Sequence, residues 1–213
     1  MVLYEEAYRR VLEAILSGKF GPGSLLKEEE LSYWLKMSRT PVREALARLE
    51  REGFVEKRGR SFAVAVLSKQ DVEQIYELRI PLEVTSAKLA ALRSPASLLD
   101  KMREVMDAII AENSKRFPDP VKMVDLSGSL HDLIAQGSSN RFLSDSLRNI
   151  KLKLKPARIQ VFLSDSRRRA EVEEHRLVYE AVRSRSQIDA EYYMEMHEAN
   201  VLKFLRENFL LTR

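Results

Sequence analysis

Glycine is distributed unevenly along this chain of 213 residues, and its placement limits the folds that the chain can adopt. Five of the seven glycines, from Gly18 to Gly59, fall in the first 60 residues. Glycine marks turns, so this part should consist of short elements joined by tight turns. The remainder repeats apolar residues at intervals of three and four, which is typical of amphipathic helices. The sequence therefore predicts a mainly α protein with a turn-rich N-terminal domain, residues 1–67, and an all-α C-terminal domain, residues 68–213.

Composition excludes several classes of protein. The 36 basic and 32 acidic side chains leave a net charge of +4, and 45% of the residues are apolar, as in soluble globular proteins. Cysteine is absent, which excludes disulfides, thiolate metal sites and cysteine nucleophiles. The N-terminus lacks the basic and apolar regions of a signal peptide, and no apolar run approaches the roughly 18 residues of a membrane span. We expect a cytoplasmic protein without a membrane partner.

The elements predicted for the N-terminal domain have the order of a winged helix-turn-helix. Apolar spacing predicts helices over 4–16, around 28–35, and over 39–52, the last with Ser38 as its N-cap. The segment FVEKRGRSFAVAV follows, with β-branched and aromatic residues on both sides of a basic tip, which predicts a hairpin. A small helical domain with an ordinary hairpin is the alternative.

Charge placement favours a DNA-binding domain over that alternative. With the apolar stripe of the third helix facing the core, Arg39, Thr40 and Arg43 project from its exposed start, the part that enters the major groove. Arginine can bond O6 and N7 of guanine together, which is worth about 1–3 kcal/mol of base discrimination. A solvated helix face would explain the third helix alone, but not the basic hairpin tip beside it. The candidate DNA contacts are Arg39, Thr40, Arg43, Arg48, Arg58 and Gly59.

A family resemblance rests on these residues. The run SRTPVREALARLEREG, with its surroundings from Pro22 to Val64, resembles the DNA-binding domain of the GntR family of bacterial transcription regulators. The resemblance implies that Arg39, Thr40 and Arg43 meet bases or phosphates, and that Gly59 lets the wing approach the minor groove. Many members carry arginine where Glu29 stands here, which implies that this DNA contact is missing or made differently.

The C-terminal domain is predicted to be an antiparallel bundle of about six helices, and it holds all three histidines. His131, His175 and His197 each lie in a segment of helical pattern, at or beside its apolar face. Three imidazoles that converged inside a bundle would bind zinc, nickel or a similar ion. Three ordinary structural histidines are the alternative. The helices are expected near 68–93, 95–115, 119–136, 139–164, 166–184 and 187–210, with Pro156 kinking or splitting the fourth.

The runs IYELRIPLEVTSAKLAAL, LHDLIAQGSSNRFL, EHRLVYEAV and MHEANV resemble the FCD ligand-binding domain of the FadR-like branch of the same family. The resemblance implies a metal, held by an aspartate and three histidines, that helps to bind a small carboxylate effector. His131, His175 and His197 stand at the histidine positions. The aspartate position, four residues before the first histidine, is Ser127 here. Asp125 is a poor substitute, because it points about 120° away from His131 on a regular helix.

The missing aspartate has two interpretations. Either the site no longer binds a metal well, or three histidines bind it with an added water held by Ser127. Arg79 and Arg158 are candidates to clamp the effector carboxylate through paired hydrogen bonds. A solvated surface position is the alternative for Arg158. The charge run from Arg167 to Arg169 is expected at the start of a helix or on the surface, and not as a second DNA site.

These features together predict a DNA-binding transcription regulator, not an enzyme. We expect a repressor that binds an inverted-repeat operator as a homodimer and responds to a small organic acid. One alternative is a DNA-binding dimer whose effector pocket has decayed. Another is a metal-dependent enzyme in which the histidines activate water. The enzyme is disfavoured because the chain has no HExxH motif, and because Asp132 and Glu174 are expected to point away from the histidines next to them.

Overall fold

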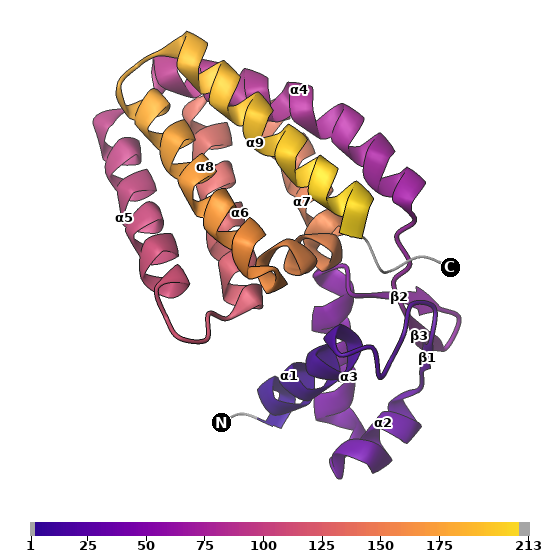
Figure 1. The fold of residues 1–213 in the computed structure, drawn as a ribbon. Helices are drawn as coiled ribbons and strands as arrows, with labels where there is room; N and C mark the ends of the chain where they lie inside the picture. Colours follow the sequence, from indigo (N-terminus) through magenta and orange to yellow (C-terminus); the bar gives the residue numbers. More distant parts are fainter. Residues whose placement is uncertain (1–2, 209–213) are drawn as a thin grey trace. The chain divides into compact units, whose positions relative to one another are not determined.

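The computed structural model describes residues 3–208, apart from the side chain of Leu152, and the chain forms two compact units (Figure 1). The first unit runs to Ser68 and the second begins at Lys69. Each unit has its own core of buried apolar side chains. None of the helices in the described range is long and apolar enough to cross a membrane.

The N-terminal unit is the predicted winged helix-turn-helix. Its core forms where α1 packs on α3, with Val11, Val42, Leu46 and Leu49 fully buried. Apolar residues three and four apart place these side chains on one face of each helix, which explains why the pattern was readable in the sequence. The elements are α1 (Leu3–Leu16), β1 (Leu25–Leu26), α2 (Glu28–Leu35), α3 (Arg39–Arg51), β2 (Val55–Arg58) and β3 (Ser61–Val64).

The strands form an antiparallel sheet in the order β1, β3, β2. The predicted hairpin is confirmed, with Val55 opposite Val64 and Arg58 opposite Ser61. The sequence analysis expected only a turn before α2, whereas β1 adds two residues to the free edge of β3. A strand of two residues is too short to show an alternating pattern, so the glycines and proline before it dominate the signal.

A two-residue loop, Gly59 and Arg60, forms the tip of the hairpin. Gly59 has a φ of +61°, a left-handed conformation that glycine adopts without the steric cost that other residues bear. Glycine at the first loop position is typical of the type II′ turn, whose twist matches that of the paired strands. Gly59 therefore shapes a tight tip that leaves Arg58 and Arg60 exposed on either side.

The C-terminal unit is the predicted helical bundle. α9 lies along α4, and α8 packs between α9 and α5, while α6 contacts α4, α5 and α7 (Figure 1). Short connections keep successive helices antiparallel neighbours. Six helices make up the described part of this unit: α4 (Lys69–Arg93), α5 (Ala96–Asn113), α6 (Pro120–Gly137), α7 (Arg141–Leu163), α8 (Asp165–Arg183) and α9 (Gln187–Asn208).

The expected split at Pro156 does not occur, because α7 runs unbroken from Arg141 to Leu163. Proline removes one helical hydrogen bond and crowds the preceding turn. The neighbouring helices α4, α6, α8 and α9 all contact α7, and this packing outweighs the local cost. Pro81 is accommodated inside α4 in the same way.

Charged side chains are buried in the middle of the bundle together with the apolar core. Burying a charge is costly unless an opposite charge or hydrogen bonds compensate it, so such a group marks a specialised site. Seven of the buried charged residues, none more than 8% exposed, form ion pairs with one another: Arg79, Glu83, Arg158, Arg167, Glu171, Glu174 and Glu198. We refer to these seven residues as the buried charge cluster.

Candidate functional site

Three helices bring the three histidines together inside the bundle. His131 lies on α6, His175 on α8 and His197 on α9, and none is more than 4% exposed. One ligand atom from each ring lies within 4.8 Å of those of the other two. The Nε2 atoms of His131 and His175 are 3.3 Å apart. We refer to the three rings as the histidine cluster.

Carboxylates contact two of the rings on the Nδ1 side. His197 Nδ1 lies 2.9 Å from Glu174 Oε2, and His131 Nδ1 lies 3.0 Å from Glu83 Oε2. The carboxylate of Glu174 accepts the Nδ1 proton of His197, which leaves the lone pair on Nε2 of that ring. Nε2 of His197 is buried and has no hydrogen-bond partner among the described residues. Metal-binding histidines commonly have this arrangement, in which a carboxylate orients the ring from behind.

Burial keeps His175 and His197 in the neutral form. Desolvation, reinforced by the neighbouring imidazoles, lowers the pKa of His175 and His197 well below the ordinary value of 6.5. The neutral imidazole is the form that binds a divalent metal. These two rings of the histidine cluster therefore offer a nitrogen lone pair at neutral pH without first having to lose a proton.

Arg79 on α4 joins two buried carboxylates beside His131. Its Nη2 lies 3.2 Å from Glu83 Oε1 and 3.0 Å from Glu198 Oε1. Burial alone would lower the pKa of Arg79, but the two carboxylates outweigh it and raise the pKa. Burial would likewise raise the pKa of Glu83, yet His131 and Arg79 hold it below its usual value. Arg79 and Glu83 of the buried charge cluster therefore stay charged in the folded protein.

Arg158 on α7 joins α8 to the position of the missing aspartate. It forms an ion pair with Glu171, and its Nη2 lies 3.2 Å from Ser127 Oγ. Ser127 Oγ is also 3.3 Å from His175 Nε2. Ser127 therefore lies inside the site, next to the histidine cluster, and Arg158 is buried instead of occupying the surface position that was its alternative.

Two other acidic residues near the histidines in sequence point away from the cluster. Asp125 lies 2.8 Å from Lys155 and its side chain is 58% exposed. Asp132 pairs with Lys151 on the surface and is 49% exposed. The outward orientation of Asp125 and Asp132 follows from helical geometry, because neither residue is separated from His131 by a whole number of turns.

The expectation for Glu174 was incomplete. Its side chain does point away from its neighbour His175, but it reaches His197 on the next helix. Arg167 bonds both carboxylate oxygens of Glu174, at 3.0 and 2.6 Å, and Asn200 donates to one of them at 2.9 Å. Contacts between helices leave no trace in the local sequence, so no pattern indicated this contact.

Arg167 to Arg169 lie at the start of α8, one of the two positions predicted for this charge run, but only one of the three side chains lies on the surface. Arg167 and Arg168 are each 8% exposed, whereas the side chain of Arg169 is 70% exposed. Three consecutive helical residues span about 200° around the axis, so they cannot all face solvent on a packed helix. Arg167 therefore belongs to the buried charge cluster.

The histidine cluster fits a divalent metal such as zinc or nickel. It offers three neutral nitrogen donors, and the unpartnered Nε2 of His197 is buried among them. The 3.3 Å between two Nε2 atoms is close to the roughly 3.4 Å that separates two ligands on one tetrahedral zinc ion. A second group at ligand spacing, Glu83, His131 and Glu198, is already occupied by Arg79.

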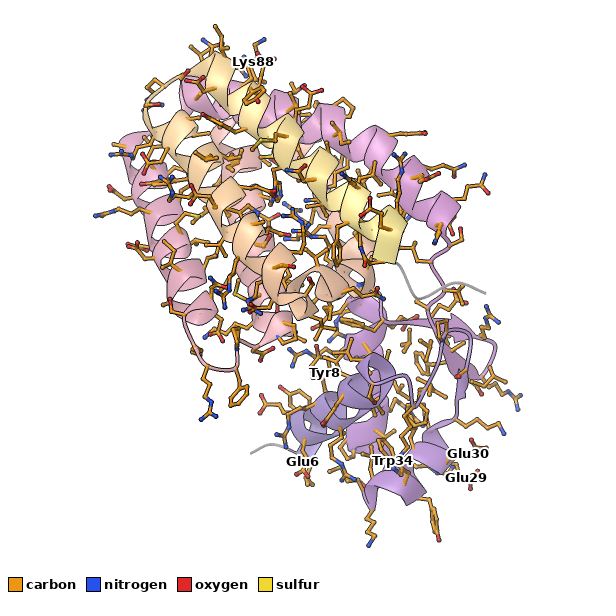
Figure 2. The ribbon with its side chains drawn as sticks, in the orientation of Figure 1. Glu6, Tyr8, Glu29, Glu30, Trp34 and Lys88 are labelled. Carbon is orange, nitrogen blue, oxygen red and sulfur yellow. The ribbon has the colours of Figure 1, made fainter. Side chains whose placement is uncertain are left out.

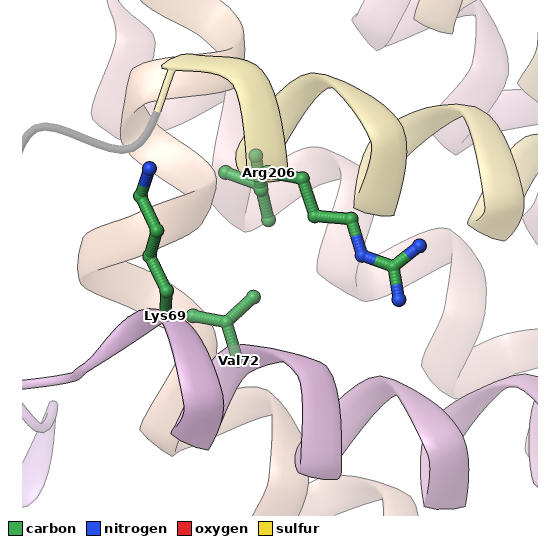
Figure 3. Close-up of a pocket in the computed structure, with 4 residues that line it drawn as sticks. Lys69, Val72 and Arg206 are labelled. Atoms are coloured by element: carbon green, nitrogen blue, oxygen red, sulfur yellow. The ribbon is translucent and has the colours of Figure 1, made fainter.

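A shallow hollow elsewhere in the C-terminal unit is a weaker candidate for a ligand site than the histidine cluster. It is lined by Lys69, Val72, Leu205 and Arg206, where the start of α4 meets the end of α9 (Figure 3). It has no room for a water molecule, and Arg206 points along it to bond Glu73 at 3.0 Å. The histidine cluster is therefore the better candidate for a ligand site.

In the N-terminal unit, acidic residues of α2 hold the two predicted base-reading arginines. Arg39 Nη2 lies 2.7 Å from Glu29 Oε1, and Arg43 bonds both oxygens of Glu28 at 2.8 to 3.1 Å. Figure 2 shows Glu29 at the start of α2. Thr40 is exposed between the two arginines. Sequence reasoning singled out Glu29 but not its contact with Arg39.

Arg48 differs from the other candidate DNA contacts. Its guanidinium lies 4.0 Å from the centre of the Tyr8 ring and its Nε is 3.0 Å from Glu52 Oε1, so it joins α1 to the end of α3. The side chain is 39% exposed, compared with 60% for Arg39 and 67% for Arg43. Arg58 and Gly59 are exposed at the hairpin tip.

Comparisons with known proteins give consistent results for both units. A model described as "Bacterial regulatory proteins, gntR family" matches residues 3–64, and a model of the FCD domain matches residues 74–200. The chain is 28% identical over 198 residues to the uncharacterized HTH-type transcriptional regulator YdhC of Bacillus subtilis, covering 91% of this chain and 87% of the relative.

Two further comparisons agree. The Nta operon transcriptional regulator of Aminobacter aminovorans is 32% identical over 144 residues, 67% of each protein. The solved structure of E. coli McbR/YncC has a TM-score of 0.70 and 18% identity, and covers 98% of this chain and 99% of that one. At that identity the structural match indicates a shared fold.

Proposed function

We propose a specific role that starts from one premise: this chain belongs to the gntR family of bacterial regulatory proteins and carries an FCD domain. It is a DNA-binding transcription regulator, and its relatives are regulators instead of enzymes. The proposal is that it acts as a repressor, binds an inverted repeat as a homodimer, and releases DNA when a small organic acid binds beside a metal in the FCD domain.

The observation that carries this proposal is the burial of three histidines together with three arginines inside one bundle. A bundle that only held the protein together would gain stability from apolar residues at these positions, since buried ion pairs contribute little net stability. Histidines and arginines in one enclosed place suit a ligand that carries negative charge.

His131, His175 and His197 would hold the metal through one nitrogen each, with Glu83 and Glu174 orienting two of the rings. A bound divalent metal supplies positive charge that attracts a carboxylate. The three arginines and four glutamates of the buried charge cluster leave one excess negative charge, which a divalent cation reverses. This balance supports an acidic effector that binds after the metal.

Arg79 and Arg158 would clamp the effector carboxylate. Both are buried, and both already bind carboxylates of the chain itself, namely Glu83 and Glu198 on one and Glu171 on the other. These internal pairs support the proposal, because they show that each guanidinium can pair with a carboxylate inside the bundle. An effector would compete with them, and α4, α7 and α8 would have to adjust.

DNA would be read by the exposed start of α3. Arg39, Thr40 and Arg43 face solvent there, and Arg58 with Gly59 would bring the hairpin tip to the minor groove. Neutralisation of phosphates by these cations makes the affinity for DNA fall with added salt.

A homodimer is supported by the exposed apolar face of α4. Leu78 and Leu92 are 55% and 57% exposed, and fourteen residues place them only about 40° apart around the helix. Large apolar side chains exposed on one face are typical of an interaction surface. Two-fold symmetry of the dimer would match the symmetry of an inverted repeat.

The test selects operator DNA from a random duplex library with the full-length protein, then measures its affinity by fluorescence anisotropy. Each measurement is made on metal-free protein and on protein loaded with zinc or nickel, with and without a panel of small carboxylic acids. We expect an inverted repeat, and at least tenfold weaker binding when one acid is added to metal-loaded protein. Selection of duplexes without symmetry would contradict the proposal.

A DNA-binding dimer with a decayed sensor is the second candidate. It is favoured by Ser127 at the aspartate position and by the internal pairing of Arg158 with Glu171. In that case no acid of the panel changes DNA affinity, and zinc and nickel bind no more tightly than they do to a variant that lacks His175.

A further inference from the structure

Glu171 is a buried carboxylate that DNA binding and acid sensing leave without a role. It lies on α8, one helical turn before His175, and it is fully buried. One of its oxygens pairs with Arg158, whereas Oε2 has no hydrogen-bond partner among the described residues. An unsatisfied buried acceptor is costly and therefore needs an explanation.

We propose that Glu171 is the anionic ligand that completes the metal site, giving a set of three histidines and one glutamate. The inference rests on the proposed metal binding at the histidine cluster. It resolves the two interpretations of Ser127, because the carboxylate is then present, but it is supplied by α8 instead of α6.

Distances support this assignment. Glu171 Oε1 lies 4.0 Å from His175 Nε2, compared with the roughly 3.4 Å expected between two ligands of one tetrahedral zinc ion. Glutamate has a flexible side chain, and a rotation that closes this small difference would exchange the pair with Arg158 for a bond to the ion. Arg167 Nη2, 3.8 Å from Oε2, would remain beside the carboxylate.

The spacing of four residues between Glu171 and His175 also supports the assignment of Glu171 as a metal ligand. Residues four apart lie on the same face of a helix, one turn from each other. Ser127 precedes His131 by four residues on α6, and Glu171 precedes His175 by four on α8. Both side chains therefore reach the histidine cluster, and only Glu171 carries the charge that strengthens binding of a divalent cation.

Movement of Glu171 to the metal would also release Arg158. That guanidinium would keep its contact with Ser127 Oγ and become free to bind the carboxylate of an effector. Metal binding would thus prepare one of the two arginines proposed for the effector clamp.

The experiment measures Co²⁺ and Zn²⁺ affinity of the full chain by competition with a chromophoric chelator, and records the visible spectrum of the Co²⁺ form. The variants are Glu171→Gln, the control Glu112→Gln, which removes a buried carboxylate of α5 that pairs with Lys115 and Lys122, and the double variant Ser127→Asp/Glu171→Gln. Circular dichroism and thermal unfolding of the metal-free proteins confirm that each variant folds.

We expect Glu171→Gln to weaken Zn²⁺ binding at least 100-fold and to change the Co²⁺ spectrum, and Glu112→Gln to change neither the affinity nor the spectrum measurably. Ser127→Asp should restore most of the lost affinity, because Ser127 Oγ already lies 3.3 Å from His175 Nε2. Equal affinities of Glu171→Gln and the native chain would overturn the assignment of Glu171. Loss of binding in His175→Ala would then show that the metal site itself stands, whereas a native chain that binds neither ion would overturn the metal-dependent function and this inference with it.

Discussion

His197 Nδ1 and Glu174 Oε2 lie 2.9 Å apart, in a contact that joins α9 to α8 and leaves the Nε2 lone pair of His197 free. Glu174 also accepts two hydrogen bonds from Arg167. The Glu174 carboxylate therefore holds the proton of His197 on Nδ1, and it also neutralises the charge of the buried Arg167.

Replacement of this carboxylate should weaken metal binding. We expect Glu174→Gln to reduce Zn²⁺ affinity about 10- to 100-fold, the usual cost of losing a carboxylate behind a histidine ligand. Urea unfolding should show a loss of about 1–3 kcal/mol, because Arg167 stays buried without its charged partner. The control is Glu173→Gln, an exposed neighbour that pairs with Arg176, which should change neither quantity measurably. Unchanged Zn²⁺ affinity in Glu174→Gln would show that His197 is not oriented by this contact.

Removal of the acidic partner of Arg39 should strengthen DNA binding. We expect Glu29→Gln to raise affinity about two- to fivefold on specific and random duplexes alike, since the exposed pair contributes at most about 1 kcal/mol and no longer competes with phosphate. Glu30→Gln is the control, because Glu30 is next in sequence but pairs with Lys27. Anisotropy titrations at two salt concentrations distinguish the variants. A loss of affinity in Glu29→Gln would instead mean that Glu29 holds Arg39 in its DNA-reading position.

Arg39→Ala should reduce discrimination between operator and mutated operator. A bidentate contact to a base is worth about 1–3 kcal/mol, so one position of the selected inverted repeat should become tolerant of other bases. Arg51→Ala, at the opposite end of α3, serves as the control. If Arg39→Ala weakens binding to all sequences equally, Arg39 contacts phosphate and not a base.

Acid should destabilise the C-terminal unit through Glu112. Hydrogen bonds from Lys115 and Lys122 hold the pKa of Glu112 at about 2, below the ordinary 4.5. A lowered pKa stabilises the folded state above pH 4.5, and this contribution disappears as pH falls from 4.5 towards 2. Glu112→Gln should therefore cost about 1–3 kcal/mol at pH 7 and much less at pH 2.5, as measured by urea unfolding. The control is Glu104→Gln, at an exposed position of the same helix. It should leave the free energy of unfolding unchanged at both pH values.

Charges on the exposed face of α4 should disrupt the dimer. We expect Leu78→Lys/Leu92→Lys to shift the protein from dimer to monomer in light scattering and to abolish its preference for an inverted repeat. The control is Phe142→Lys on α7, where the native side chain is 69% exposed. A double variant that remains dimeric would place the interface on another surface.

The fold was largely predictable because its signals are local. The apolar stripe of α3 and the glycine at the hairpin tip each act within a few residues, so the winged helix-turn-helix was visible in the sequence. The strand β1 was missed because two residues show no period. The split that was one of the two outcomes expected at Pro156 does not occur, because contacts with other helices keep α7 continuous.

The candidate site was predictable only in part. Helical periodicity placed the histidines on buried faces, but the pairing of His197 with Glu174 depends on how α8 and α9 cross. Burial of Arg158 and Arg167 likewise depends on packing between helices. The spacing from Glu171 to His175 was present in the sequence, and it gained meaning only when the structure placed Arg158 and Ser127 beside it.

His197 lies on α9, and α9 packs along α4, the first helix of the same unit. Five helices of the bundle are synthesised before α9, and until α9 is added the growing chain contains only two of the three rings. An ion that needs all three can be captured only after the two ends of the domain have met. Retention of the ion would then distinguish finished domains from those cut short during synthesis.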